Sequence, residues 1–363
     1  MACAQAAEPT VPTVAAALAA LPAPPPGGPS VSPRPAHGES KAPPAPAFDA
    51  PYLGHLAPDE SLSIGTTRGG YVVGARRLEP GPGLALRDSA VTRGALWGTA
   101  TFVEAIARAA RHVAQRFPGS VLFVGDLGLE HGGAIPPHRS HASGRDVDLT
   151  FYVTDADGRP ADGPAMTRVD AEGRVAGGGK RFDAARNWAL VEALLRDPAI
   201  QIQWIFVAAH LEPLLLAAAA EAGAPPALVE RAARVMQQPG DSSPHADHFH
   251  VRVYCTEPER LQGCLDAAPV HPWVDTHDDA VARWIEGLVP FLADPRGASG
   301  DEFRFAVERL VRANARAALP HLEPLAGHPD PATRALVVDA IDFLSGRRTP
   351  QAWARWRPED VGD

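Results

Sequence analysis

The sequence predicts an α+β fold: a small mixed or antiparallel sheet with flanking helices, followed by an all-α C-terminal region. Two observations support this. Period-two strand patterns alternate with helical patterns up to residue 266, and strand patterns are absent beyond it. The 363 residues also exceed what one compact core usually organises. We therefore expect a leader or linker over residues 1–50, a first folded domain over 51–266 and a helical region over 267–363.

The first 50 residues contain 12 proline and 15 alanine residues, a composition that buries too little surface to offset the entropy of ordering. We expect a disordered, partly polyproline-like segment. Residues 11–23 are apolar enough for the hydrophobic part of a signal peptide, but Glu8 precedes them where a positive charge is typical. Cys3 is a lipidation site only if the true start lies upstream.

Charge and hydropathy exclude two classes of protein. The net charge of −9 and the acidic isoelectric point leave no broad basic surface for phosphates, so we do not expect a nucleic-acid partner. The longest apolar runs, such as residues 214–220, are far shorter than the roughly 20 residues that span a bilayer. We expect no transmembrane segment.

Up to residue 140 the pattern predicts short strands, one helix and a further strand. Residues 61–92 alternate β-favouring pieces with glycine and proline, which is typical of strands joined by tight turns. Thr101 begins a capping box that opens an amphipathic helix, and Pro118 ends it. Residues 120–125 are then expected to form a buried strand, followed by a glycine-containing loop.

The elements expected between residue 140 and residue 266 continue the alternation. Apolar residues at every second position predict a strand over 146–154. The other segments expected are, in order, a helix over 186–196, a strand over 203–208, helices over 213–222 and 226–237, and a strand over 249–254.

Three helices are predicted in the C-terminal region, over residues 278–292, 301–318 and 331–344, with proline and glycine between them. Residues 325–334 resemble the start of a HEAT-type helical repeat, although a stacked solenoid needs at least three repeats. A helical appendage that offers a surface to a protein partner is the simpler interpretation.

Cys255 and Cys264 lie close together just after the last predicted strand. This spacing suits a disulfide-closed loop in an oxidising compartment. Two cysteines alone cannot complete a four-ligand structural zinc site, which favours the disulfide.

The residues that carry chemistry lie in two short windows, residues 138–148 and 245–250, which hold five of the fourteen histidines. The strand period of two places His248 and His250 on one face of their strand, with Phe249 directed to the core. In the first window, Asp146 and Asp148 likewise share a face.

Two carboxylates so close raise each other's pKa unless a cation neutralises them. One histidine and one aspartate of the first window, with one histidine of the second, would form a catalytic zinc set with an open fourth position. The alternative is a chance cluster on a solvated strand edge. The combination of both windows favours a zinc hydrolase.

The run from Ser140 to Asp148, with His138 ahead of it, resembles the first metal motif of the penicillin-insensitive murein endopeptidases. These are zinc metallopeptidases of the D-Ala-D-Ala carboxypeptidase and lysostaphin-like superfamily. Residues 245–253 resemble the closing motif of the same family, and the similarity covers roughly residues 60–265.

The resemblance implies an enzyme that hydrolyses the D-alanyl to diaminopimelyl cross-links of peptidoglycan with a zinc-activated water. It also implies three zinc ligands, one catalytic histidine beside the water and two further site histidines. These are His141, Asp148 and His250 as Zn²⁺ ligands, His248 as the catalytic histidine, and His138 and His245 as the assisting ones. Spacing alone leaves open whether His248 ligates the same ion.

The resemblance also implies a periplasmic location, with a tether to the outer membrane through Cys3 if a signal lies upstream. Three parts of the chain depart from the family: the leader, the segment 161–180 and the region after residue 266. Two alternatives remain. One is a zinc D-Ala-D-Ala carboxypeptidase or dipeptidase, and the other is a non-catalytic wall-binding scaffold with a degenerate zinc site.

Overall fold

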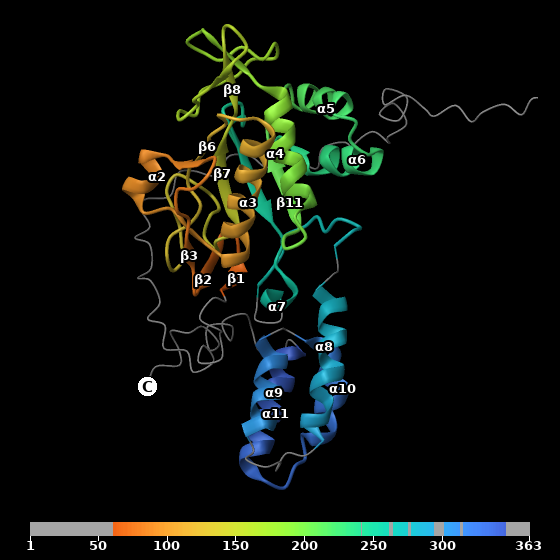
Figure 1. The fold of residues 1–363 in the computed structure, drawn as a ribbon. Helices are drawn as coiled ribbons and strands as arrows, with labels where there is room; N and C mark the ends of the chain where they lie inside the picture. Colours follow the sequence, from red (N-terminus) through yellow and green to blue (C-terminus); the bar gives the residue numbers. More distant parts are fainter. Residues whose placement is uncertain are drawn as a thin grey trace, which may run out of the picture.

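The structure, a computed structural model, describes residues 61–240, 242–260, 264–274, 277–293, 301–312 and 315–345. It confirms the α+β class, with helices at the C-terminal end (Figure 1). The predicted leader, its apolar segment and Cys3 lie outside the described residues.

A six-stranded mixed sheet forms the centre of the first part of the chain. Its order is β12-β11-β13-β7-β6-β4; the pairs β12–β11 and β6–β4 are parallel and the others antiparallel. The strands are β4 (Leu84–Leu86), β6 (Leu122–Val124), β7 (Asp146–Thr150), β11 (Ile202–Phe206), β12 (Met236–Gln237) and β13 (His248–Val253).

Helices α3 (Ala100–Arg116) and α4 (Ala184–Arg196) lie across one face of this sheet (Figure 1). The core between them takes apolar side chains from both layers, such as Ile106 and Leu190 from the helices and Leu149 and Phe249 from the strands. The other helices here are α2 (Asp88–Arg93), α5 (Glu212–Glu221), α6 (Pro226–Val235) and α7 (Glu257–Arg260). The opposite sheet face is left for polar side chains.

Three smaller sheets border the central one. They are β1 (Leu62–Thr66) with β2 (Gly69–Val73), β3 (Arg76–Arg77) with β5 (Trp97–Gly98), and β8 (Val153–Asp155) with β9 (Pro160–Ala161) and β10 (Lys180–Phe182). Strands β9 and β10 of the last sheet lie at the two ends of the segment 161–180, and this sheet projects beyond the end of the central sheet (Figure 1). The N–H of Val169 donates to the carbonyl of Ala246, which anchors this segment beside the second histidine window.

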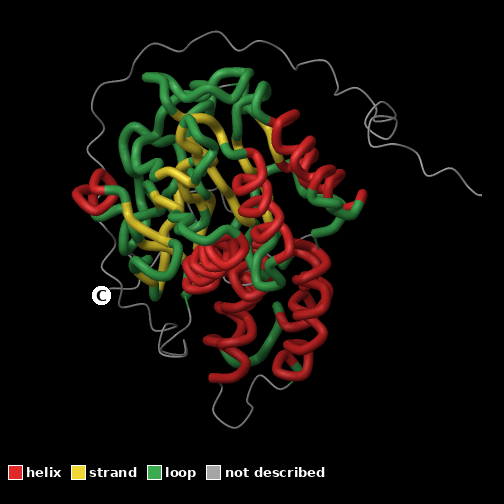
Figure 2. Tube along the Cα trace, turned by 45° about the horizontal axis from the view of Figure 1, so that its top comes forward, coloured by secondary structure: helices red, strands yellow, loops and turns green. Residues whose placement is uncertain are grey.

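The C-terminal helices form a bundle with a hydrophobic core of its own (Figure 2). They are α8 (His277–Leu292), α9 (Asp301–Arg312), α10 (Leu319–Leu322) and α11 (Pro331–Leu344), with single 3₁₀ turns over Arg316–Ala318 and Glu323–Leu325. Among the described residues, none of the helices combines the length and apolarity that crossing a bilayer requires.

Several predicted boundaries are wrong. Helix α3 begins at Ala100 after an extended Thr99, so Thr101 lies in the first turn and forms no capping box. The expected strand over 146–154 is two strands, because the side chain of Asn187 hydrogen-bonds to both the N–H and the carbonyl of Tyr152 and removes them from the ladder. The expected helix over 301–318 ends at Arg312.

The predicted disulfide between Cys255 and Cys264 is present. The closed loop contains α7 and follows directly after β13. Asp266, just beyond it, accepts hydrogen bonds from the N–H of Cys255 and from the buried guanidinium of Arg145. The loop is thereby tied to the first histidine window.

Candidate metal centre

The structure brings the six predicted site residues together on the polar face of the central sheet. The histidine rings of both windows are in contact: the ring centroids of His138 and His141 lie 4.4 Å apart, those of His141 and His250 4.7 Å, and those of His245 and His248 5.2 Å. Asp148 lies among them.

The pairing of β7 with β13 explains this convergence. His250 is directly opposite Asp148 and Arg252 is opposite Asp146, so the polar residues of both strands share one face. The alternate residues, such as Val251, enter the apolar core as predicted. Residues a hundred positions apart in sequence become neighbours through this register.

His141 is held in a strained conformation that aims its ring into the centre. Its φ of 71° makes it the one non-glycine residue with a positive φ in the described part of the chain, and such residues concentrate at functional sites. Its Nδ1–H donates to the carbonyl of Leu127 at 2.9 Å. The Nε2 atom therefore carries the lone pair, and it is buried without a hydrogen bond.

Asp148 is the carboxylate at the middle of the cluster. Its Oδ1 lies 3.4 Å from His141 Nε2 and 3.2 Å from His250 Nδ1. Burial opposes its ionisation, but the interactions with the neighbouring histidines, His141 and His248 above all, outweigh burial and hold its pKa well below the usual range. Oδ1 is nevertheless buried without a hydrogen bond, so two ligand-type atoms face each other unpaired.

Asp146 is a buried carboxylate beneath the cluster, and it contacts His250 rather than the middle of the cluster. Its Oδ1 accepts from Nε2 of His250 at 2.8 Å and from Nε of Arg252 at 2.7 Å. Burial raises its pKa, but Arg252 and the hydrogen bond from His250 lower it further than burial raises it, so Asp146 is ionised. An ionised carboxylate can only accept, which fixes the proton of His250 on Nε2 and leaves Nδ1 facing Asp148.

His138 lies at the edge of the cluster and is held by a second buried carboxylate. Its Nε2 lies 2.7 Å from Oδ2 of Asp126 and 3.9 Å from Oδ2 of Asp148. Asp126 Oδ2 also pairs with Arg93, at 2.9 Å. The sequence analysis gave no role to Asp126 or Arg93. One ligand-type atom each from His138, His141 and Asp148 lies within 4.8 Å of the others, a spacing that can hold a metal ion.

His245 and His248 line the other side of the centre. Nδ1 of His248 donates to Asp247 at 2.6 Å, and its Nε2 lies 3.6 Å from Oδ1 of Asp148. Burial lowers the pKa of His248, but the charges of Asp148 and Asp247 outweigh this and raise it. Burial lowers the pKa of His245 to about 4, so its ring is neutral.

An open cleft of about 870 Å³ gives access to the cluster. The cleft is lined by His138, His245, His248 and His250, together with Phe206 of β11 and residues 242–244. Such a groove is large enough for several residues of an extended peptide.

The donor set fits a divalent metal. Ligand-type atoms of His138, His141 and Asp148 lie together, and His250 Nδ1 lies 3.2 Å from Asp148 Oδ1. Leu127 and Asp146 hold the other ring nitrogens of His141 and His250, which is how metal-binding histidines are usually oriented. Without an ion, His141 Nε2 and Asp148 Oδ1 would remain buried and unpaired, and each would destabilise the folded protein by the cost of a buried polar atom without a hydrogen bond.

Comparison with known proteins supports a peptidase. Residues 63–299 match the sequence model of the penicillin-insensitive murein endopeptidase family. A search of curated proteins finds no match.

Proposed function

We propose that this chain, which belongs to the penicillin-insensitive murein endopeptidase family, is a zinc endopeptidase. It hydrolyses the D-alanyl to diaminopimelyl cross-links of peptidoglycan. The match covers more than half of the chain and includes both histidine windows. The cleft and the metal-type donor set agree with a peptidase that binds an extended substrate.

One observation carries the proposal: His141 Nε2 and Asp148 Oδ1 are buried, unpaired and directed at each other, with His250 Nδ1 beside them. We propose these three atoms as the zinc ligands. His138 is the competing third ligand, but its Nε2 is already held by Asp126. When bound, zinc would supply Lewis-acid chemistry, polarising a carbonyl and lowering the pKa of water.

The chain's own residues would handle the proton. His248 keeps its Nδ1–H on Asp247, so its Nε2 is free to accept a proton at the centre and to donate it to the leaving amine. The neutral His245 would act as a further hydrogen-bond donor toward developing negative charge, and His138, whose Nε2 is held by Asp126, would assist from the edge of the cluster. Such a site acts without a covalent serine intermediate, so β-lactams would have no nucleophile to acylate.

We propose the periplasm as the location, since the substrate of the family is murein. The disulfide between Cys255 and Cys264 supports an oxidising compartment.

The test is digestion of purified cross-linked muropeptide dimers by the zinc-loaded protein, with products separated by chromatography and identified by mass. An endopeptidase converts dimers to monomers, is stopped by a chelator and is unaffected by penicillin. Release of free D-alanine without loss of dimers would instead indicate the carboxypeptidase alternative. Binding to murein sacculi without any cleavage would indicate the scaffold alternative.

A further inference from the structure

We infer that the disulfide between Cys255 and Cys264 and a zinc ion at the metal centre stabilise each other. The chain would then bind zinc weakly in a reducing compartment and tightly once the disulfide has formed. The inference rests on the zinc ligands of the proposed function and adds a redox control of that site.

A first connection runs from the disulfide loop to His250. Asp266 Oδ1 accepts from the N–H of Cys255 and from Nη1 of Arg145, both at 2.9 Å. Arg145 directly precedes Asp146, whose Oδ1 accepts from Nε2 of His250. The loop is therefore joined to a proposed zinc ligand through two carboxylates and the arginine between them.

Arg145 is a buried cation that binds this connection together. Its side chain is 1% exposed. Besides Asp266, it donates to Ser63 Oγ at 3.0 Å and to the carbonyls of Val253 and Leu265 at 3.0 and 3.1 Å. Removing one partner of a buried ion pair leaves an uncompensated charge, so such a pair resists rearrangement. A displacement of Asp266 is therefore passed on to the backbone of the first histidine window.

A second connection runs from the same loop to His141 through the β1–β2 hairpin. The N–H of Leu265, just after the second cysteine, donates to the carbonyl of Gly65 in β1 at 2.9 Å. In the turn that follows β1, the carbonyl of Thr67 accepts from the N–H of Ala142 at 3.0 Å. Ala142 directly follows His141, whose positive φ is a strained conformation that its neighbours must hold.

The disulfide and the ion thus restrict the same buried contacts from opposite ends. The disulfide fixes the end that carries Leu265 and Asp266, and an ion bound by His141 and His250 fixes the other end. Each reduces the freedom that the other must remove, which gives positive coupling. Such coupling is reciprocal by thermodynamic linkage.

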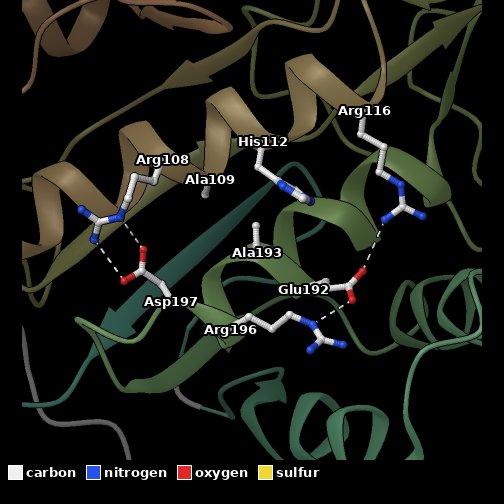
Figure 3. A pocket seen from close by; sticks show the side chains of 8 residues that line it. All are labelled: Arg108, Ala109, His112, Arg116, Glu192, Ala193, Arg196 and Asp197. Carbon is white, nitrogen blue, oxygen red and sulfur yellow. Dashed lines mark hydrogen bonds and ion pairs between the residues drawn. The ribbon is translucent and has the colours of Figure 1, made fainter.

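The groove between α3 and α4 supplies a matched control (Figure 3). Asp197 accepts there from Nε of Arg108 at 2.8 Å and from the N–H of Ala199 at 2.9 Å. It therefore has a guanidinium and a backbone partner, as Asp266 has. The two helices cover the apolar face of the central sheet, and Asp197 belongs to neither connection.

The first measurement is zinc affinity in competition with a chelator of known affinity. The variants are Cys255→Ser/Cys264→Ser, Asp266→Asn and the control Asp197→Asn; serine is used because free thiols bind zinc themselves. The serine variant and Asp266→Asn should bind zinc about 5-fold or more weakly than the wild type, as is typical of coupling between two sites. Asp197→Asn should match the wild type.

The second measurement is the reduction of the wild-type disulfide in glutathione buffers, with and without saturating zinc. Two glutathione thiols reduce the disulfide to two cysteine thiols and form one oxidised glutathione. Because linkage is reciprocal, zinc should raise the ratio [GSH]²/[GSSG] at half reduction by the factor found for the serine variant. Zinc held by the released thiols would shift the ratio the opposite way, so it does not mimic this result.

Equal zinc affinity in the wild type and the serine variant, or a redox midpoint that zinc does not raise, would overturn the inference and leave the proposed function intact. Equal losses in Asp197→Asn and Asp266→Asn would also overturn it, because the loss would then reflect general stability. Failure of the wild type to bind zinc would overturn the proposed function and the inference with it.

Discussion

Each histidine at the centre of the cluster has one ring nitrogen fixed by a neighbouring oxygen, and this decides which nitrogen is left for a ligand. Leu127 fixes His141, Asp146 fixes His250 and Asp247 fixes His248. The sequence identifies the histidines because they lie in two dense windows. It does not reveal the partners of His141 and His250, since Leu127 is placed by the loop before the first window and Asp146 by the register between β7 and β13. Asp247, in contrast, directly precedes His248 in the sequence.

The first prediction concerns the third ligand. His250→Ala should lose stoichiometric zinc, because His250 Nδ1 faces Asp148 Oδ1, whereas His138→Ala should keep about one zinc per chain because His138 is held by Asp126. Metal content after dialysis against a defined zinc buffer measures this. If His138→Ala loses zinc and His250→Ala retains it, the ligand set is His138, His141 and Asp148.

The second prediction separates binding from chemistry at His248. Replacing it by alanine should preserve zinc content and lower turnover of cross-linked dimers by about 10²- to 10⁴-fold, the usual contribution of a proton-transferring or oxyanion-stabilising group. Asp247→Asn keeps the imidazole but changes its orienting partner, so it should give a smaller loss. Zinc loss in His248→Ala would make this residue a ligand, and normal turnover would make it a bystander.

At the scale of the elements, alternation and helix periodicity predict which segments form strands and helices, while their ends depend on tertiary contacts. The strand after Asp146 continues by pattern through residue 154, but it stops where Asn187 captures the backbone of Tyr152. Strand β12 at the end of α6 could not be expected, since only its pairing with β11 makes Met236 and Gln237 extended. The apolar and polar faces of β13 follow directly from its sequence.

The third prediction belongs to the loop closed by Cys255 and Cys264. Replacing both by serine should lower the free energy of unfolding by about 2–3 kcal/mol, because a bridge across a sequence separation of 9 restricts the unfolded chain. Urea unfolding under non-reducing conditions measures it, with Cys3→Ser as the control. Full thiol labelling of both residues in native protein from an oxidising compartment would contradict the bridge itself.

At the scale of the whole molecule, the described chain contains two separate hydrophobic cores. One joins the central sheet to α3 and α4, and the other joins α8 to α11. Arg283 of α8 forms an ion pair with Glu257 of α7, and because both side chains are half exposed this contact between the two parts contributes little. We propose that the two cores unfold as separate units, in agreement with a domain boundary near residue 266.

The last prediction follows from these two cores. The zinc-loaded protein should show two calorimetric transitions, and a chelator should lower the midpoint of only one. Of the metal-type ligands, Asp148 and His250 lie on strands of the central sheet and His141 lies in the loop that leads into β7, so all belong to the first unit. Leu190→Ala removes a fully buried side chain of α4, and Leu310→Ala removes one of α9. Each should cost about 2–5 kcal/mol in its own unit. Leu190→Ala should therefore lower the chelator-sensitive transition and Leu310→Ala the other. A single transition that both substitutions shift equally would mean that the C-terminal helices fold as one unit with the peptidase sheet.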